Sequence, residues 1–329
     1  MSRGAEGRID GILPFDKPPG WTSNQALQRV RRRLGPGVRG GYQGTLDPLA
    51  TGLLPIALGA ARGFLSYFAV SPKLYRVEAR LGQQTRTGDR EGEVLAQGPV
   101  PDLGFDEMAS DLAGRTGTSL QVPPMFSALK HKGVPLYRLA RRQLEVERPS
   151  RPIEVFRVSL LDWVPPTARF ELECGPGLYV RSWVEDWARS LGTVAHVSGL
   201  RRLRAGCFRE EDLVTWEDLE PVRDRLRPVD WPLAHLPRLE LDPREVDRLI
   251  RGQPVGISGP VEPGPLRLYD RAGAFLGLGS DSGVDGLRAL RLCPTGARLS
   301  RSTARTGPHE GGDDPGRHSG ALCEKGAPE

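Results

Sequence analysis

The chain has 329 residues, of which 38% are hydrophobic and 26% charged, and its formal net charge is +5. This hydrophobic content is enough for a packed interior and excludes wholesale disorder, while the length favours two domains. No apolar run approaches the roughly 20 residues that span a bilayer, and the first residues lack the apolar core of a secretory signal. We therefore expect a cytoplasmic protein without a membrane partner, and the mild positive charge permits a polyanionic partner without requiring one.

Residue types argue against a metal site, a disulfide framework and a bound nucleotide. The four cysteines lie far apart, and the five histidines form no short-spaced set of ligands. No glycine-rich phosphate-binding signature is present, so we expect neither a cofactor nor a metal. The basic residues are almost all arginine, which suits RNA because the guanidinium binds phosphate bidentately and stacks on bases. A GC-rich genome also enriches arginine, and we take this as the main cause of the bias.

The first predicted element is a helix that begins at Thr22–Asn24 and ends at Gly35. Its first residues can cap the backbone N–H groups of the first turn, and the glycine stops the helix. The hydrophobic residues recur at helical spacing on one face and are Ala26, Leu27, Val30 and Leu34. The arginines of 29–33 are interpreted as a solvated face.

Two alternating segments, 74–81 and 169–174, predict half-buried strands, and glycines end the second strand. A helix over Val180–Leu191 follows, because its hydrophobic residues recur every three or four positions. From residue type alone, Tyr75 is an ordinary strand aromatic and Arg181 a solvated residue at a helix start. Leu200 is core, His196 is a structural polar residue, and the arginines of 201–204 form another solvated face.

The composition turns proline-rich over Arg227–Pro237, which indicates a domain joint. A short helix at Pro243–Ile250 and strand-like pieces at Leu266–Tyr269 and Ala274–Leu278 then indicate a small β-rich module. Large apolar residues are almost absent from 300–329, so we expect a disordered tail whose removal leaves activity intact.

The segment from Gly40 to Pro55 contains a single acidic residue, Asp47. Pro48 disfavours helical dihedrals at Asp47, and the flanking glycines allow sharp bends and the close approach of a ligand. A lone carboxylate among apolar neighbours either caps a turn or needs a cation partner. Residue types alone favour the cap.

Several segments together resemble the TruB-type tRNA pseudouridine synthases, bacterial enzymes that convert the T-loop uridine of tRNA, position 55, to pseudouridine. The segments occur in the expected order and are Phe15–Ser23, Gly44–Gly52, Lys73–Val77, Leu81–Asp89, Pro124–Lys130, Gly177–Arg181 and Ala195–Arg202. The resemblance is strong from about Gly11 to Phe208 and looser in the C-terminal module. It implies an α/β (α+β) fold with a long mixed, mostly antiparallel sheet flanked by helices.

The resemblance also implies a domain organisation. We expect a flexible N-terminus at residues 1–9, a catalytic domain at 10–232 and a PUA-like RNA-binding β-barrel at 236–295, followed by the disordered tail. The barrel would hold the acceptor-stem side of tRNA through phosphates and shape. The partner would be the T-arm and elbow of tRNA, bound by a monomer.

The resemblance implies an isomerase with Asp47 as nucleophile and Arg181 as its ion-pair partner. Tyr75 would stack on the target uracil, and Leu200 would pack against the base or the catalytic pocket. The resemblance assigns the remaining substrate-side positions to Tyr179, Asp89 and Tyr42. The reaction neither oxidises nor hydrolyses the substrate, so it needs no cofactor or metal; the carboxylate would hold the intermediate covalently in a cavity that excludes water.

Two alternatives stay open, and both keep the scaffold. One is a non-catalytic tRNA-folding or RNA-binding protein, and the other is a synthase that acts on uridines of other RNAs. The sequence also departs from the family: Tyr42 and Gln43 replace a histidine and a threonine, Pro176 replaces a lysine, and Gly88 replaces the more usual serine. These departures affect the expected handling of RNA rather than the reaction class.

Overall fold

The computed structural model describes residues 9–256, 263–281, 283 and 286–294. The expected disordered tail at 300–329 lies outside these residues, as does all of the expected flexible N-terminus except Ile9. Both expectations stay predictions. The domain limits proposed from the sequence also stay predictions.

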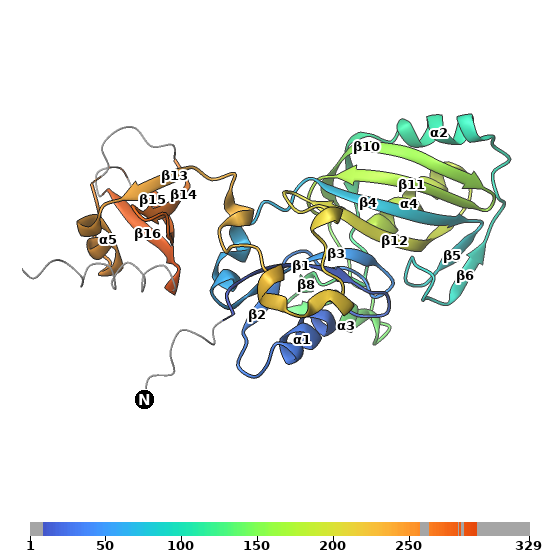
Figure 1. Ribbon diagram of the computed structural model, residues 1–329. Helices are drawn as coiled ribbons and strands as arrows, with labels where there is room; N and C mark the ends of the chain where they lie inside the picture. Colours follow the sequence, from blue (N-terminus) through green and yellow to red (C-terminus); the bar gives the residue numbers. More distant parts are fainter. Residues whose placement is uncertain (1–8, 257–262, 282, 284–285, 295–329) are drawn as a thin grey trace, which may run out of the picture.

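A mixed sheet of eight strands forms the larger part of the molecule (Figure 1). Its order is β1-β3-β12-β4-β11-β10-β7, with β2 paired to β3. All pairs along this path are antiparallel except β12 with β3, which is parallel. The strands are β1 (Gly11–Lys17), β2 (Gly40–Tyr42), β3 (Thr51–Leu58), β4 (Lys73–Leu81), β7 (Gly117–Gln121), β10 (Arg151–Val164), β11 (Thr167–Cys174) and β12 (Ala195–Ala205). The expected mixed, mostly antiparallel sheet is confirmed.

Alternation along β4 separates a buried face from a solvated one, as the sequence predicts. Tyr75, Val77 and Ala79 are buried, whereas Arg76 and Arg80 are exposed. Helix α4 (Val180–Ser190) covers the buried face, where Trp183 and Trp187 place their rings 5.7 and 5.6 Å from that of Phe170 on β11. Burial of these aromatic rings is the main apolar contribution that fixes α4, and with it the start of that helix, against the sheet.

The helix predicted after Thr22 is α1 (Ser23–Arg33). Thr22 caps its N-terminus, since its hydroxyl accepts from the N–H of Gln25 while the Gln25 side chain accepts from the N–H of Thr22. Its buried residues include Ala26 and Val30. The capped end therefore holds Ser23 in a fixed place beside the loop that precedes β3.

Shorter elements border the sheet. Helix α2 (Phe105–Ala113) contacts β10, and β5 (Gln83–Thr85) pairs with β6 (Val94–Gln97). The segment between β7 and β10 carries β8 (Lys130–His131), which pairs with β9 (Val134–Pro135), and α3 (Leu136–Ala140). Short 3-10 helices complete the domain: η2 (Gly59–Tyr67), η3 (Glu210–Asp212), η4 (Glu217–Leu219), η5 (Val222–Arg225) and η6 (Trp231–Leu233).

The C-terminal module contains a sheet of four strands in the order β13-β14-β15-β16. Its elements are β13 (Arg238–Leu241), α5 (Pro243–Ile250), β14 (Pro265–Asp270), β15 (Phe275–Asp281) and β16 (Leu287–Leu292). The helix and strands predicted from the sequence are therefore present. Among the described residues the pairing runs from β13 to β16 without closing, and the expected PUA-like barrel stays a prediction.

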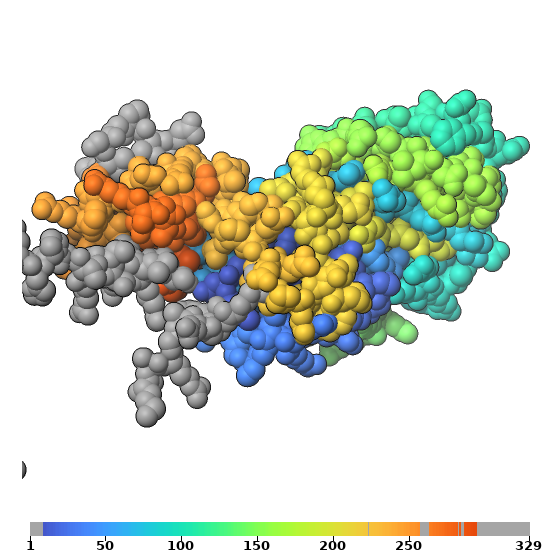
Figure 2. Space-filling model, in the orientation of Figure 1, coloured from blue at the N-terminus to red at the C-terminus, as the bar shows by residue number. Residues whose placement is uncertain are grey.

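The module packs against the larger domain, beside which it lies in Figure 2. The ring of Phe275 lies 5.4 Å from that of Phe64 in η2, and Leu278 and Cys293 belong to the same buried cluster. Leu233, in the proline-rich segment, is buried in that cluster too. The predicted joint is therefore part of a packed contact.

Candidate active site

The loop that carries Asp47 connects β2 to β3 and is held from both sides. The buried hydroxyl of Ser23 donates to the carbonyl of Leu46 and accepts from its N–H, at 3.0 and 2.8 Å. The backbone of Asp47 accepts from the N–H of Ala50 at 3.1 Å. Gly44, within the same loop, adopts a φ of +72°, which a residue with a side chain rarely takes.

Lys17 lies fully buried beneath this loop at the end of β1. Its ammonium donates to the carbonyls of Pro18, Trp21 and Pro48, the last at 3.2 Å. Burial lowers the pKa of Lys17 to about 8, and the charge of Asp47 partly opposes this shift. The lysine thus joins the residue after Asp47 to the start of α1.

Asp47 and Arg181 form a bidentate ion pair, although they are 134 positions apart in the sequence. Arg181 Nε lies 2.8 Å from Asp47 Oδ2, and Arg181 Nη2 lies 3.0 Å from Asp47 Oδ1. The side chain of Arg181 is only 4% exposed, against 31% for that of Asp47. Two parallel charge-assisted hydrogen bonds fix the carboxylate in orientation as well as in charge.

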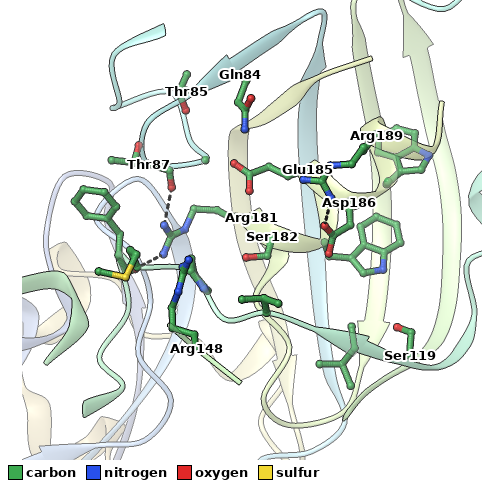
Figure 3. A pocket seen from close by; sticks show the side chains of 18 of the residues that line it. Gln84, Thr85, Thr87, Ser119, Arg148, Arg181, Ser182, Glu185, Asp186 and Arg189 are labelled. Carbon is green, nitrogen blue, oxygen red and sulfur yellow. Dashed lines mark hydrogen bonds and ion pairs between the residues drawn. The ribbon is translucent and has the colours of Figure 1, made fainter. Parts of the chain in front are cut away.

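The remaining contacts of Arg181 are with backbone carbonyls. Nη1 donates to Thr87 at 2.7 Å, and Nη2 donates to Phe126 at 2.8 Å (Figure 3). The interpretation of Arg181 as a solvated residue is therefore wrong, because three separate segments bury it. The interpretation of Asp47 as a turn cap does not describe its carboxylate, since both oxygens accept from Arg181.

The ion pair lines a cavity of about 230 Å³. Tyr75, Tyr179 and Leu200, all predicted from the resemblance, line it as well. Other lining residues are Gly44, Thr45, Leu46, Lys73, Phe126, Ser127, Ala128, Gly177, Leu178 and Val180. Burial raises the pKa of both tyrosines, so their phenols are neutral near pH 7. The cavity therefore combines the Asp47–Arg181 ion pair and Lys73 with walls that are otherwise mostly aromatic and apolar.

Two predicted residues, Asp89 and Tyr42, lie outside this lining. Asp89 is buried behind the arginine, where its Oδ2 is 3.9 Å from Arg181 Nε. Its Oδ1 accepts from the hydroxyl of Thr87 at 2.6 Å and so shapes the loop that also binds Arg181. Tyr42 lies on β2 and packs against the main core. The direct substrate contacts expected of both residues stay predictions.

Three buried or half-buried cations near the cavity were missed from the sequence: Lys17, Lys73 and Arg202. Arg202 is 1% exposed and donates to the carbonyls of Leu53 and Gly44 at 2.7 and 2.9 Å, so its assignment to a solvated face is wrong. A signal existed for two of them. Lys17 shares the strand register of Leu13 and Phe15, and Lys73 shares the inward register of Tyr75.

Arg181 also borders a second, larger cavity of about 910 Å³, which Figure 3 shows. Gln84, Glu185 and Arg148 lie around the guanidinium there. Burial raises the pKa of Glu185. Among the residues that the structure describes, no group of three His, Cys, Asp or Glu side chains is placed to hold a metal ion, and no helix is long and apolar enough to cross a membrane.

Comparison with protein families identifies matches along most of the chain. The N-terminal domain of TruB family pseudouridylate synthases matches residues 31–180. The C-terminal domain of tRNA pseudouridylate synthase B matches residues 181–234, and the C-terminal domain of pseudouridine synthase II TruB matches residues 237–292.

Comparison with individual proteins gives the same family. The tRNA pseudouridine synthase B of Chromohalobacter salexigens is 44% identical over 277 residues, which cover 82% of this chain and 90% of the relative. That of Aromatoleum aromaticum is 42% identical and covers 89% and 96%. Among solved structures, a chain of a Cbf5-Nop10-Gar1 complex superposes with a TM-score of 0.66 at 23% identity, covering 88% and 86% of the two chains, and supports the fold.

Proposed function

The chain belongs to the TruB family of pseudouridine synthases, and we propose that its substrate is the T-loop uridine of tRNA, at position 55. Membership in the family makes the protein an isomerase that forms pseudouridine in tRNA. The identity of the uridine and the roles of individual residues are the proposal.

One observation carries the mechanism: Asp47 is paired bidentately with a buried arginine inside a small cavity. To form pseudouridine, uracil must leave the ribose through N1, turn, and rejoin it through C5. We propose that Asp47 is the nucleophile that holds the intermediate covalently. Arg181 keeps the carboxylate charged and oriented. The permanently protonated, forked guanidinium is better suited to this task than the ammonium of a lysine.

The aromatic and apolar walls of the cavity suit a base that has been flipped out of the stacked RNA. A uridine inside a folded loop must be flipped, at a cost of a few kcal/mol. Stacking on Tyr75 would return about 1–3 kcal/mol of that cost. Leu200 and Tyr179 would close the cavity around the base and keep out water, which would otherwise intercept the intermediate.

Further contacts would position the RNA. Asp89 would position the base or the loop around Thr87, where it also supports Arg181, and Tyr42 replaces a family histidine near the distorted T-loop. The C-terminal module would bind the acceptor-stem side through phosphates, so tRNA binding should weaken steeply with salt.

The direct experiment incubates tRNA transcripts with the wild type and with Asp47→Ala, then maps pseudouridine. We expect one modified T-loop uridine with the wild type and none with the variant, while tRNA binding survives. A protein that only folds tRNA would bind without product. Product at uridines of ribosomal or messenger RNA would favour the other alternative, which mapping in cells that lack the protein detects.

A further inference from the structure

Lys73 brings a positive charge into the same cavity as Asp47, and the proposed mechanism does not use it. It is the first residue of β4, where it pairs with Cys174 on β11 and Ala205 on β12. It lies two positions before Tyr75, so the two side chains extend from the same face of the strand. Both line the cavity together with Leu200.

The ammonium of Lys73 makes no hydrogen bond or ion pair with any residue that the structure describes. The other buried cations near the site are all occupied: Lys17 by three carbonyls, Arg202 by two, and Arg181 by a carboxylate and two carbonyls. A half-buried charge without a partner lowers the stability of the folded state, and such charges are rare in native proteins. An oxygen of the substrate would supply the missing partner.

No carboxylate is among the groups that shift the pKa of Lys73, and Asp47, which lines the same cavity, is already paired with Arg181. Burial and the charge of Arg202 lower the pKa of Lys73. The thiol of Cys174 stays neutral, because burial raises its pKa to about 12. The two flanking elements therefore supply a neutral thiol, a methyl group and a second cation, and none of these satisfies the ammonium.

We propose that Lys73 binds O2 or O4 of the flipped uracil and stabilises the negative charge that the detached ring carries. This inference rests on the proposed function. When the N1–C1′ bond breaks, its electron pair remains on the ring and spreads over N1, O2 and O4. When C5 bonds to C1′, the bond that Asp47 made to the intermediate breaks and its electron pair returns to the carboxylate. The hydrogen of C5 then leaves as a proton and N1 gains one, so the overall change is an isomerisation. The ammonium keeps its proton throughout and acts by its charge.

The position of Lys73 favours a ring oxygen over a phosphate. It shares a strand face with Tyr75, the residue proposed to stack on the uracil, and its neighbours along the sheet are Cys174 and Ala205. The ribose phosphates must stay attached to the rest of the RNA outside a cavity of only about 230 Å³.

The test compares Lys73→Met with Arg76→Gln. Arg76 lies on the same strand but is exposed on the opposite face and paired with Glu171, so its replacement removes an equal charge away from the cavity. For Lys73→Met we expect the single-turnover rate to fall about 100-fold, as for loss of one preorganised donor. The affinity for tRNA should stay within about threefold. Arg76→Gln should change neither.

Thermal unfolding separates a functional from a structural lysine. Removing an unpartnered, half-buried charge should leave the Tm of Lys73→Met equal to or above that of the wild type, whereas loss of a structural lysine would lower it. Lys73→Gln, which keeps a polar head group, should also lose rate, and Lys73→Arg should recover part of it. A wild-type rate in both Lys73→Met and Lys73→Gln overturns the inference.

Substrate atoms identify the bound oxygen. Transcripts with 2-thiouridine or 4-thiouridine at the target weaken one acceptor at a time, and the ratio of wild-type to Lys73→Met rates should shrink for one of them. If instead only a methylphosphonate 5′ to the target removes the ratio, the ligand is a phosphate and the inference is wrong. Absence of product with the wild type would refute the proposed function itself, a separate outcome.

Discussion

The two faces of strand β4 place similar charges in different surroundings. On the outer face, Arg169 pairs with Glu78 at 2.9 Å, yet its side chain is 55% exposed. On the cavity side, Arg181 pairs with Asp47 at 2.8 Å, and the side chain of Arg181 is only 4% exposed. Exposed pairs contribute about 0–1 kcal/mol because water and salt compete for both ions. A buried cation instead lowers the stability of the fold unless all of its polar groups have partners.

This difference explains how the site is built. Outer-face charges have several partners, as Arg169 has in Glu78 and Asp162, and losing one changes little. Near the cavity, Arg181 is held bidentately by Asp47 and by two fixed carbonyls, with the Asp89 carboxylate 3.9 Å away, so each contact has a specific geometry. The charges that matter for chemistry are the ones that the fold removes from water.

The largest effect should follow from Arg181→Met. The variant leaves Asp47 without its cation and frees the carbonyls of Thr87 and Phe126, so we expect a loss of single-turnover rate of at least about 1,000-fold. Unfolding in urea should show a loss of roughly 3 kcal/mol, since breaking a buried pair strands its partner. Arg181→Lys keeps the charge but not the fork, and wild-type activity in that variant would show that bidentate geometry is unimportant.

A second experiment tests whether burial of a cation lowers the free energy of unfolding. It compares the wild type with Lys17→Met at several pH values. The pKa of Lys17 is about 8 in the folded protein and 10.5 in the unfolded chain. Between these values the unfolded chain binds more protons, so the stability contributed by Lys17 rises with pH across pH 8 to 10.5, by on the order of 3 kcal/mol. Below pH 8 both states are protonated and the full cost of burying the charge is present.

Urea unfolding of the wild type and of Lys17→Met at pH 7.5, 9 and 10 measures this contribution. Because other groups titrate equally in both proteins, the difference between them isolates Lys17. The difference should shift in favour of the wild type as the pH rises. A shift in the opposite direction would mean that the three carbonyls more than offset the burial of the ammonium.

The smallest effect is expected on the outer face. Arg169→Gln removes the pairs with Glu78 and Asp162, both exposed, and should leave the free energy of unfolding nearly unchanged, because water and salt already compete for these ions. The modification rate should not change. A loss of activity comparable to that of Arg181→Met would remove the distinction between the two faces.

Regular patterns made much of the fold predictable. The strand at 74–81, the strand at 169–174 and the helices after Thr22 and at 180–191 all appear, because their hydrophobic residues recur at strand or helix spacing. Strand β12 was not predicted as a strand, since its arginines interrupt the apolar pattern. Arg202 is buried because it donates to two backbone carbonyls that are distant in sequence, Leu53 on β3 and Gly44 in the loop before it.

The site was predictable only through the family resemblance. From residue types alone, Asp47 was interpreted as a cap and Arg181 as surface, because their pairing joins positions 134 residues apart. Local patterns contain no information on such contacts. The same limit applies to Lys73, whose register predicts an inward side chain but not the absence of a partner.

The most direct measurement is a structure of Asp47→Asn bound to tRNA. The variant keeps the shape of the carboxylate but removes its charge, which should trap the substrate unreacted. The account predicts the T-loop uridine flipped into the cavity, stacked on Tyr75, with its ribose or ring beside residue 47. A different nucleotide in that position, or a T-loop uridine still stacked within the RNA, would contradict it.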